Sequence, residues 1–250
     1  MMFNLNRYRL CEVFGIPLYV DISFAVLLLF FALSSSSFVG GILLAVLLAA
    51  SVVMHECGHS LAARAFGYET RDITISLLGG CASLTALPRK AYQEFLTAAA
   101  GPAVSFLIAF VAYAFAEFSG LNGFFRSQFY VLYVMNMMLG TFNLLPALPM
   151  DGGRIFKSFL RLFIPKLQAT RIAMYVGRSL AVAIVVLPMI GIDHIGIFPL
   201  GGSLIRFFIA YMIWVESMRE YKMACYENPF TRWRQQDFRA RVSPPPYGDD

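Results

Sequence analysis

The sequence predicts an all-α polytopic membrane protein of about six transmembrane helices, with a small membrane-associated β-hairpin or sheet between the second and third. Composition is the first observation, because 58% of the 250 residues are hydrophobic and 14% are charged. The second is that apolar segments recur at roughly the 20-residue length that crosses a bilayer, and the third is one alternating segment between them. The expected spans cover residues 22–33, 42–63, 94–118, 128–148, 172–192 and 203–218.

The first span follows a polar and aromatic lead at residues 1–21. A cleaved signal sequence is the alternative for residues 22–33, but the leader is long and no convincing small-residue cleavage site follows it. We therefore expect an uncleaved first span, with Asp21 as its N-cap.

The second span carries the sequence HECGH at residues 55–59, near its C-terminal end. His55 and His59 are four positions apart, so they share one face of a helix and can bind the same zinc ion. Glu56 lies near that face and can activate water as a general base. Cys57 lies about 200° around the helix from His55 and is a poor ligand candidate. A chance pattern of polar core residues is disfavoured, because ionisable groups in an apolar span are costly.

Residues 66–88 alternate apolar and polar side chains on either side of Gly79 and Gly80. This alternation is typical of a β-hairpin. The segment is too polar for a span and too apolar for a free loop, so we expect it to lie against the membrane beside the second span. An irregular loop is the alternative.

The third and fourth spans add a stretch of small residues and a lone carboxylate. Ala98–Ala103 would let another helix approach closely, and Pro102 frees a backbone carbonyl group there. The fourth span ends in FNLLPALPMDGGR at residues 142–154, in which Asp151 is the only carboxylate. Two prolines break the helix just before Asp151. Such irregular backbone is tolerated at membrane depth only where protein or water surrounds it.

A hydrolytic zinc site needs a third protein ligand besides two histidines. Asp151 is the favoured candidate, because it lies near membrane depth on the same expected side as the histidines. The other carboxylates have simpler functions: Asp21 as a helix cap, Asp72 as a solvated loop charge and Glu94 as a charge at a helix start. His194 is expected on the opposite side, as a solvated loop residue.

The basic residues indicate the orientation of the chain in the membrane, and they explain its net charge of +5 without a nucleic-acid partner. Nearly all of them fall on one side if the N-terminus is cytoplasmic and six spans follow, so we expect both termini and the active-site opening to face the cytoplasm of a bacterial (inner) membrane. A basic amphipathic segment on the membrane surface and a basic, proline-rich, disordered tail are expected on that side. The basic residues there are Arg7, Arg9, Arg64, Arg71, Arg89, Lys90, those of residues 154–171 and those of the tail.

The cysteines show no CxxC spacing, so neither a disulfide framework nor a cysteine zinc site is indicated. They are expected to be free thiols: Cys11, Cys57, Cys81 and Cys225.

Three motifs together resemble the site-2 proteases, intramembrane zinc metalloproteases of the M50 type that cut transmembrane substrates. The motifs are HECGH at 55–59, GPAVS at 101–105 and NLLPALPMDGG at 143–153. Their order and spacing make the match specific, whereas HExxH alone would not, and it covers a catalytic core of about residues 40–160. No PDZ or CBS domain is recognised, so a minimal form is expected. Its expected parts are a cytoplasmic lead at 1–21, a six-span protease domain at 22–218 and the tail at 219–250.

The resemblance implies one zinc ion held by His55, His59 and Asp151, with Glu56 activating the water. The hairpin resembles the family's membrane-associated sheet, to which an unwound substrate segment can add as a strand. Four further residues match positions that support substrate binding or active-site geometry in the family: Gly101, Pro102, Asn143 and Pro149.

The expected function is hydrolysis of a peptide bond in or near the transmembrane segment of membrane-anchored substrates, such as single-span proteins. An intact helix shields its own peptide bonds, so the substrate must unwind locally, and the first, fifth and sixth spans are candidates for gating its lateral access.

Three competing functions differ in the chemistry that they need. A membrane zinc peptidase with a downstream glutamate ligand is disfavoured, because Glu117 lies at the far end of its span. A membrane metal transporter or non-catalytic zinc-binding membrane protein would need the metal ligands but not Glu56. An inactive relative is disfavoured by the intact motifs.

Overall fold

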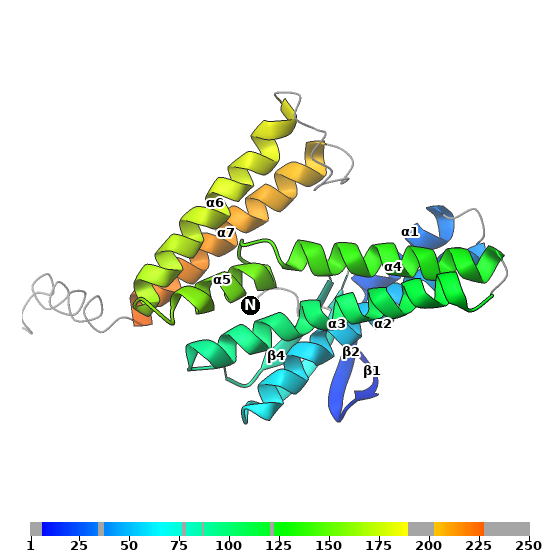
Figure 1. Ribbon diagram of the computed structural model, residues 1–250, viewed down its shortest axis with the longest axis horizontal. Coiled ribbons are helices and arrows are strands. Elements are labelled where there is room, and N and C mark those ends of the chain that lie inside the picture. Colours follow the sequence, from blue (N-terminus) through cyan, green and yellow to red (C-terminus); the bar gives the residue numbers. More distant parts are fainter. Residues whose placement is uncertain are drawn as a thin grey trace, which may run out of the picture. The chain divides into compact units, whose positions relative to one another are not determined.

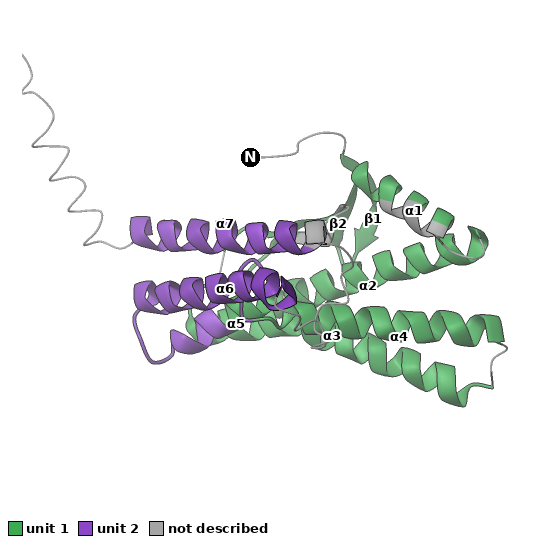
Figure 2. Ribbon diagram, turned by 90° about the horizontal axis from the view of Figure 1, so that it is seen from above, with its two compact units in different colours: residues 1–145, 150–155 green, residues 146–149, 156–250 purple. Residues whose placement is uncertain are grey.

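The computed structural model describes residues 7–34, 38–76, 79–86, 88–120, 123–189 and 203–227. In this part of the chain it contains seven helices and four strands (Figure 1). The chain forms two compact units, which we describe separately (Figure 2). Unit 1 comprises residues 1–145 and 150–155, and unit 2 comprises residues 146–149 and 156–250.

Unit 1 contains a sheet of four strands in the order β1-β2-β3-β4. The predicted hairpin is confirmed by β3 (Thr70–Ser76) and β4 (Gly79–Leu84), which pair antiparallel. The N-terminal lead adds a second antiparallel hairpin, β1 (Arg7–Val13) and β2 (Ile16–Asp21), which was not predicted from the sequence. Strands β2 and β3 pair in parallel and join the two hairpins.

The inner face of this sheet packs on α2 (Phe38–Ala65). Ile16 and Leu18 of β2 form a core with Ile73 and Ile75 of β3, and α2 contributes Val53 and Cys57 to it. Cys57 is therefore buried among apolar side chains as a free thiol and takes no part in the histidine face, as its place on the helix predicts.

The short helix α1 (Ser23–Ser34) follows β2 directly. Asp21 accepts a hydrogen bond from the backbone N–H of Ser23 at 2.8 Å, so it caps the start of this helix as expected. Hydrogen bonds from the Ser23 side chain and backbone lower the pKa of the Asp21 carboxyl.

Three further helices complete unit 1: α3 (Ala91–Phe118), α4 (Gly123–Asn143) and the first residues of α5 (Asp151–Leu160). Helices α2 and α3 approach closely at Gly58. A β-carbon at this position would lie less than 3.0 Å from the backbone oxygen of Ala100, so a larger residue does not fit. Asn136 of α4 is fully buried and donates a hydrogen bond to the Ser51 hydroxyl group of α2 at 3.0 Å. Small residues thus bring the helices together and polar side chains connect them, as expected for helices packed in a membrane.

Unit 2 consists mainly of α6 (Lys166–Met189) and α7 (Ser203–Glu227), which lie side by side and antiparallel (Figure 1). The guanidinium group of Arg178 stacks on the ring of Trp214, 4.3 Å from its centre. At one end of the pair, an ion pair joins Lys166, the first residue of α6, to Glu227, the last residue of α7.

Judged by length and apolar composition alone, three of the described helices could cross a membrane: α2, α3 and α6. Helix α1 has 12 residues and is about 18 Å long, which is short for a hydrocarbon core of about 30 Å. The expected fourth span ends early, because α4 stops at Asn143. The six-span count therefore stays a prediction. The expected tail begins too early, because residues 219–227 continue helix α7. His194 and residues 228–250 lie outside the described residues.

Candidate metal centre

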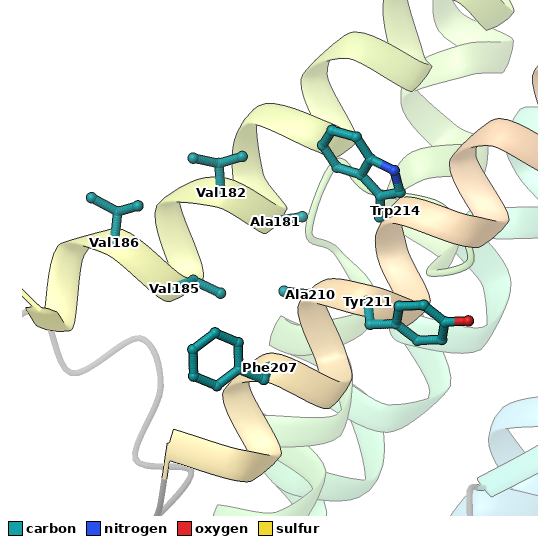
Figure 3. A pocket seen from close by; sticks show the side chains of 8 residues that line it. All are labelled: Ala181, Val182, Val185, Val186, Phe207, Ala210, Tyr211 and Trp214. Atoms are coloured by element: carbon teal, nitrogen blue, oxygen red, sulfur yellow. The ribbon is translucent and has the colours of Figure 1, made fainter.

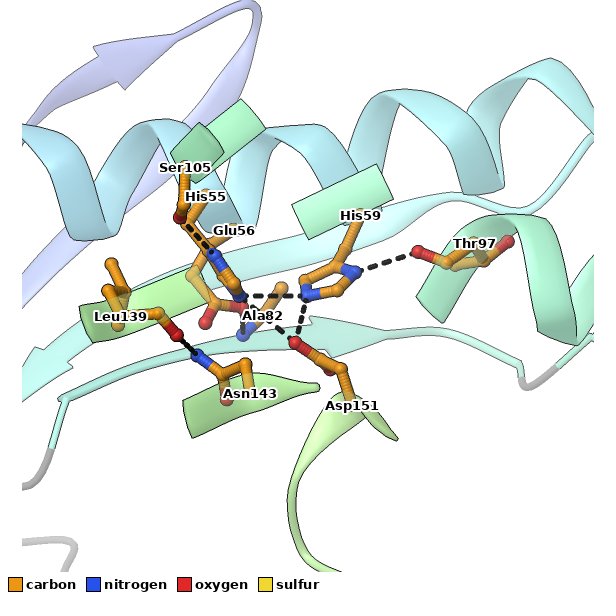
Figure 4. Close-up of polar contacts among 9 residues, drawn as sticks. All are labelled: His55, Glu56, His59, Ala82, Thr97, Ser105, Leu139, Asn143 and Asp151. Atoms are coloured by element: carbon orange, nitrogen blue, oxygen red, sulfur yellow. Dashed lines mark hydrogen bonds and ion pairs between the residues drawn. The ribbon is translucent and has the colours of Figure 1, made fainter. Parts of the chain in front are cut away.

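The two histidines of HECGH lie on one face of α2 and are both buried. Their Nε2 atoms are 3.2 Å apart, and the two rings meet edge to face with centres 4.9 Å apart (Figure 4). The four-residue spacing thus produces the shared face that the sequence predicts.

Asp151 lies at the start of α5 and reaches both histidines. Its Oδ2 atom is 3.1 Å from Nε2 of His55 and 3.1 Å from Nε2 of His59 (Figure 4). Among the residues that the structure describes, these three form the one group of metal-binding side chains, with donor atoms within 4.8 Å of one another. The structure therefore brings together the three residues expected as ligands.

Gly152 explains how the chain brings Asp151 to this position. After α4 ends at Asn143, the backbone folds back so tightly that a β-carbon at residue 152 would overlap the carbonyl groups of Leu144 and Leu145. Only glycine fits there. The Asp-Gly pair of the motif thus combines the expected ligand, Asp151, with the glycine that lets the chain turn this side chain toward α2.

The carboxyl group of Asp151 favours its ionised form. Burial acts to raise its pKa, but the facing imidazoles of His55 and His59 lower it by more, so the pKa of Asp151 lies below its ordinary value. An ionised carboxylate is the form that binds a metal cation.

Helix α3 orients both imidazoles from one side. The backbone oxygen of Thr97 lies 2.7 Å from Nδ1 of His59, and the hydroxyl oxygen of Ser105 lies 2.8 Å from Nδ1 of His55 (Figure 4). Between them, a β-carbon at Gly101 would lie less than 3.0 Å from both imidazoles, so the helix can approach only because this residue is glycine. Pro102, the next residue, is fully buried inside α3.

Glu56 is held by the sheet. Its Oε2 atom accepts a hydrogen bond from the backbone N–H of Ala82 in β4 at 3.0 Å (Figure 4). A β-carbon at Gly80 would overlap the Glu56 side chain, so this glycine makes room for it. The sequence predicted a hairpin beside the second span. It did not predict the contacts of Ala82, Thr97 and Ser105, because a backbone group or a serine side chain in a sequence does not indicate which residue it will contact in the folded protein.

The remaining expected residues lie as follows. Asn143 donates a hydrogen bond to the Leu139 carbonyl at the end of α4, and its expected support of substrate or site geometry stays a prediction, as does that of Pro149. Asp72 is not a solvated loop residue: it lies buried in β3, 4.0 Å from Arg7 and 3.7 Å from Arg71. Glu94 is in the first turn of α3, as expected, but is buried.

The donor set fits one zinc ion. Two imidazole nitrogens and one carboxylate oxygen are the ligands of many hydrolytic zinc sites, which leave a fourth position for water or substrate. The three donors are buried, and their donor atoms lie 3.1–3.2 Å from one another.

Comparisons with known proteins agree with this geometry. The model of peptidase family M50 matches residues 43–126 and 121–184. A zinc metalloprotease of Methanocaldococcus jannaschii is 35% identical over 190 residues, which are 75% of this chain and 55% of that protein. A protein of Synechocystis sp., named as a candidate zinc metalloprotease, is 36% identical over 213 residues, 78% of this chain and 56% of that protein. The chain thus spans little more than half the length of these curated relatives.

A solved structure is also similar. The site-2 protease from Methanocaldococcus jannaschii aligns with a TM-score of 0.60 and 30% sequence identity, covering 86% of this chain and 95% of that one. The family model covers more than half of the chain, and it includes the helix of the histidine pair as well as Asp151. The chain belongs to peptidase family M50.

Proposed function

We propose that this protein is a zinc-dependent intramembrane endopeptidase, which hydrolyses a peptide bond in or near the transmembrane segment of single-span membrane proteins. The observation that carries the proposal is the meeting of His55, His59 and Asp151 at 3.1–3.2 Å, beside a glutamate on the same helix. This helix is also a candidate membrane span, which supports a substrate that lies in the membrane.

His55, His59 and Asp151 would hold the ion. When bound, zinc supplies Lewis acidity, which polarises a scissile carbonyl group and makes water more acidic. Glu56 is half-buried next to the buried ligands, so it is placed to take a proton from water and to pass it to the leaving amine. Its hydrogen bond with Ala82 fixes one carboxylate oxygen and leaves the other for the proton.

Strand β4 offers a surface for the substrate backbone. It is the last strand in the sheet order, so one of its edges has no strand partner among the described residues. An unwound substrate segment can pair with such an edge through main-chain hydrogen bonds. Glu56 binds β4 through Ala82, so a segment paired there would lie beside the proposed base.

The distribution of basic residues supports an orientation in which the metal centre opens toward the cytoplasm. The exposed side chains of Arg71, in β3, and Arg89, after β4, are examples that follow the end of α2 that carries the histidines.

The test is Glu56→Gln. The full chain is co-expressed with candidate single-span membrane proteins tagged at both ends, and the fragments are compared between the wild type and the variant. We expect wild-type cleavage to be lost in Glu56→Gln, a fall of at least about 100-fold, because the amide cannot take a proton. Zinc content should stay at the wild-type level, since the three ligands are intact.

The same fragments from both proteins would refute the proposal. A metal transporter, by contrast, would keep much of its flux in Glu56→Gln, because transport needs no general base.

A further inference from the structure

The two imidazoles are oriented by different kinds of group, although both groups come from α3. His59 faces a backbone carbonyl oxygen, that of Thr97, whereas His55 faces a side-chain hydroxyl group, that of Ser105. The orientation of His55 therefore depends on which amino acid stands at position 105, whereas the orientation of His59 does not depend on the side chain at position 97.

For His59 the backbone fixes the ring. A carbonyl oxygen can only accept a hydrogen bond, so Nδ1 of His59 must carry the proton and Nε2 has the free lone pair. No side-chain substitution at Thr97 removes this oxygen.

For His55 the fixing group is one side-chain oxygen. Nε2 of His55 is the nitrogen that faces Asp151 and His59, at 3.1 and 3.2 Å, so this nitrogen must offer its lone pair to a shared metal ion. Nδ1 then carries the proton, and the Ser105 hydroxyl oxygen at 2.8 Å is its acceptor. Ser105 is fully buried, so water does not readily replace the hydroxyl group.

We propose that Ser105 is a positioning residue of the metal centre: its hydroxyl group accepts the hydrogen bond from Nδ1 of His55 and so turns Nε2 toward the ion. This inference rests on the proposed function, because it assumes that the three ligands bind zinc. Thr97, Gly101 and Ser105 follow one another at four-residue intervals, the same spacing as the histidine pair. These three residues therefore share one face of α3. Thr97 provides a hydrogen-bond acceptor for His59, Gly101 leaves space for both rings, and Ser105 provides an acceptor for His55.

The competing explanation is that Ser105 is only a small residue that lets α3 pack closely. Ser105→Ala keeps the small size and removes the acceptor, whereas Ser105→Thr keeps the hydroxyl group and adds a methyl group. Ser60 of α2 offers a matched control, because it is a buried serine whose hydroxyl oxygen has no hydrogen-bond partner among the described residues.

The experiment measures zinc affinity rather than cleavage. Each full-length variant is purified in detergent, its fold is checked by circular dichroism, and zinc is titrated against a chromophoric chelator at one pH. We expect Ser105→Ala to bind zinc about 10- to 100-fold more weakly than the wild type, the effect typical of removing a group that orients a metal-binding histidine. Ser105→Thr should recover most of this loss, and Ser60→Ala should bind like the wild type. The visible spectrum of the cobalt-substituted protein should change in Ser105→Ala alone.

Three results would overturn the proposal. In the first, folded Ser105→Ala binds zinc as tightly as the wild type. In the second, Ser105→Ala and Ser105→Thr lose affinity equally, which would assign the loss to packing. In the third, the wild type itself binds no zinc, which would remove the proposed function as well. His55→Ala is the control for the metal centre itself. If the wild type binds zinc at this centre, His55→Ala must abolish that binding, whichever residue stands at position 105.

Discussion

The α2–α3 contact in unit 1 and the α6–α7 contact in unit 2 are both made by long apolar helices, but they are packed differently. At the first, Gly58 and Gly101 bring backbone and imidazole atoms so close that no β-carbon fits. At the second, larger side chains leave an apolar hollow of about 390 Å³ between the helices, lined among others by Val185, Phe207 and Trp214 (Figure 3). The α2–α3 contact therefore leaves no space for a larger side chain at these glycines, whereas the α6–α7 contact has unfilled space beside its side chains.

The difference fits the proposed metal centre, whose two histidines lie at the α2–α3 contact. Metal ligands must keep their positions to within fractions of an ångström, and close backbone packing restricts the movement of side chains. A hollow lined by apolar groups forfeits some packing contacts and tolerates changes of side-chain size. We therefore expect substitutions of equal size to have unequal effects at the two contacts.

The largest difference is expected for glycine-to-alanine substitutions. Gly101→Ala places a methyl group against both imidazoles, so we expect zinc binding and cleavage to be abolished, although alanine is the better helix former by about 1 kcal/mol. Gly177→Ala in α6 meets mainly the Ser217 hydroxyl group and should keep full zinc content. Metal analysis of the two purified variants tests this. Equal zinc content in both would contradict the comparison.

A smaller effect is expected where the sheet touches Glu56. Ala82→Pro removes the N–H that binds the Glu56 carboxylate, and proline is tolerated on a strand edge whose N–H points away from the sheet. We expect cleavage to fall about 10-fold, which is less than the roughly 100-fold expected when the general base is removed, because Glu56 loses its alignment but keeps its carboxylate. Zinc affinity should be unchanged, which separates this effect from loss of the metal centre. Unchanged cleavage would show that Glu56 needs no support from β4.

The smallest effect concerns one buried alanine in α3 and one in α6. Ala109 of α3 and Ala181 of α6 are both buried, but Ala181 also lines the apolar hollow. Ala109→Leu should destabilise unit 1 by about 1–3 kcal/mol through overpacking. Ala181→Leu has space to enter and should change stability by less than about 1 kcal/mol. Thermal unfolding in detergent measures both, and equal losses of stability would mean that the hollow is not available to a larger side chain.

Local patterns predicted part of this molecule well. The spacing of His55 and His59 fixes their common face, and the alternation around Gly79 and Gly80 identified the β3–β4 hairpin. The choice of Asp151 over the other carboxylates agrees with its place beside both histidines. The shared face and the hairpin could be predicted because each depends on helix or strand periodicity. The choice of Asp151 depended on a carboxylate set in irregular backbone, and its role as a ligand stays a prediction.

Contacts between distant segments were not predicted. The β1–β2 hairpin was missed because its alternation is interrupted by a register shift between Arg9 and Cys11, and because its parallel partner β3 follows about fifty residues later. The hydroxyl group of Ser105 and the N–H of Ala82 became visible as site components only once α3 and β4 were in place. The number of spans stays a prediction, since α1 is short and α4 ends before the prolines.

The parallel pairing of β2 with β3 constrains how the chain is threaded through the bilayer. In the described part of the chain, the elements between these strands are α1 and α2, and both strands belong to one sheet. A sheet cannot be divided between two aqueous compartments, so the chain from β2 to β3 must make an even number of crossings. If α2 crosses once, the segment that contains α1 has to cross as well, in the opposite direction. The N-terminal hairpin and the histidine end of α2 then face the same compartment, a conclusion that needs no count of charges.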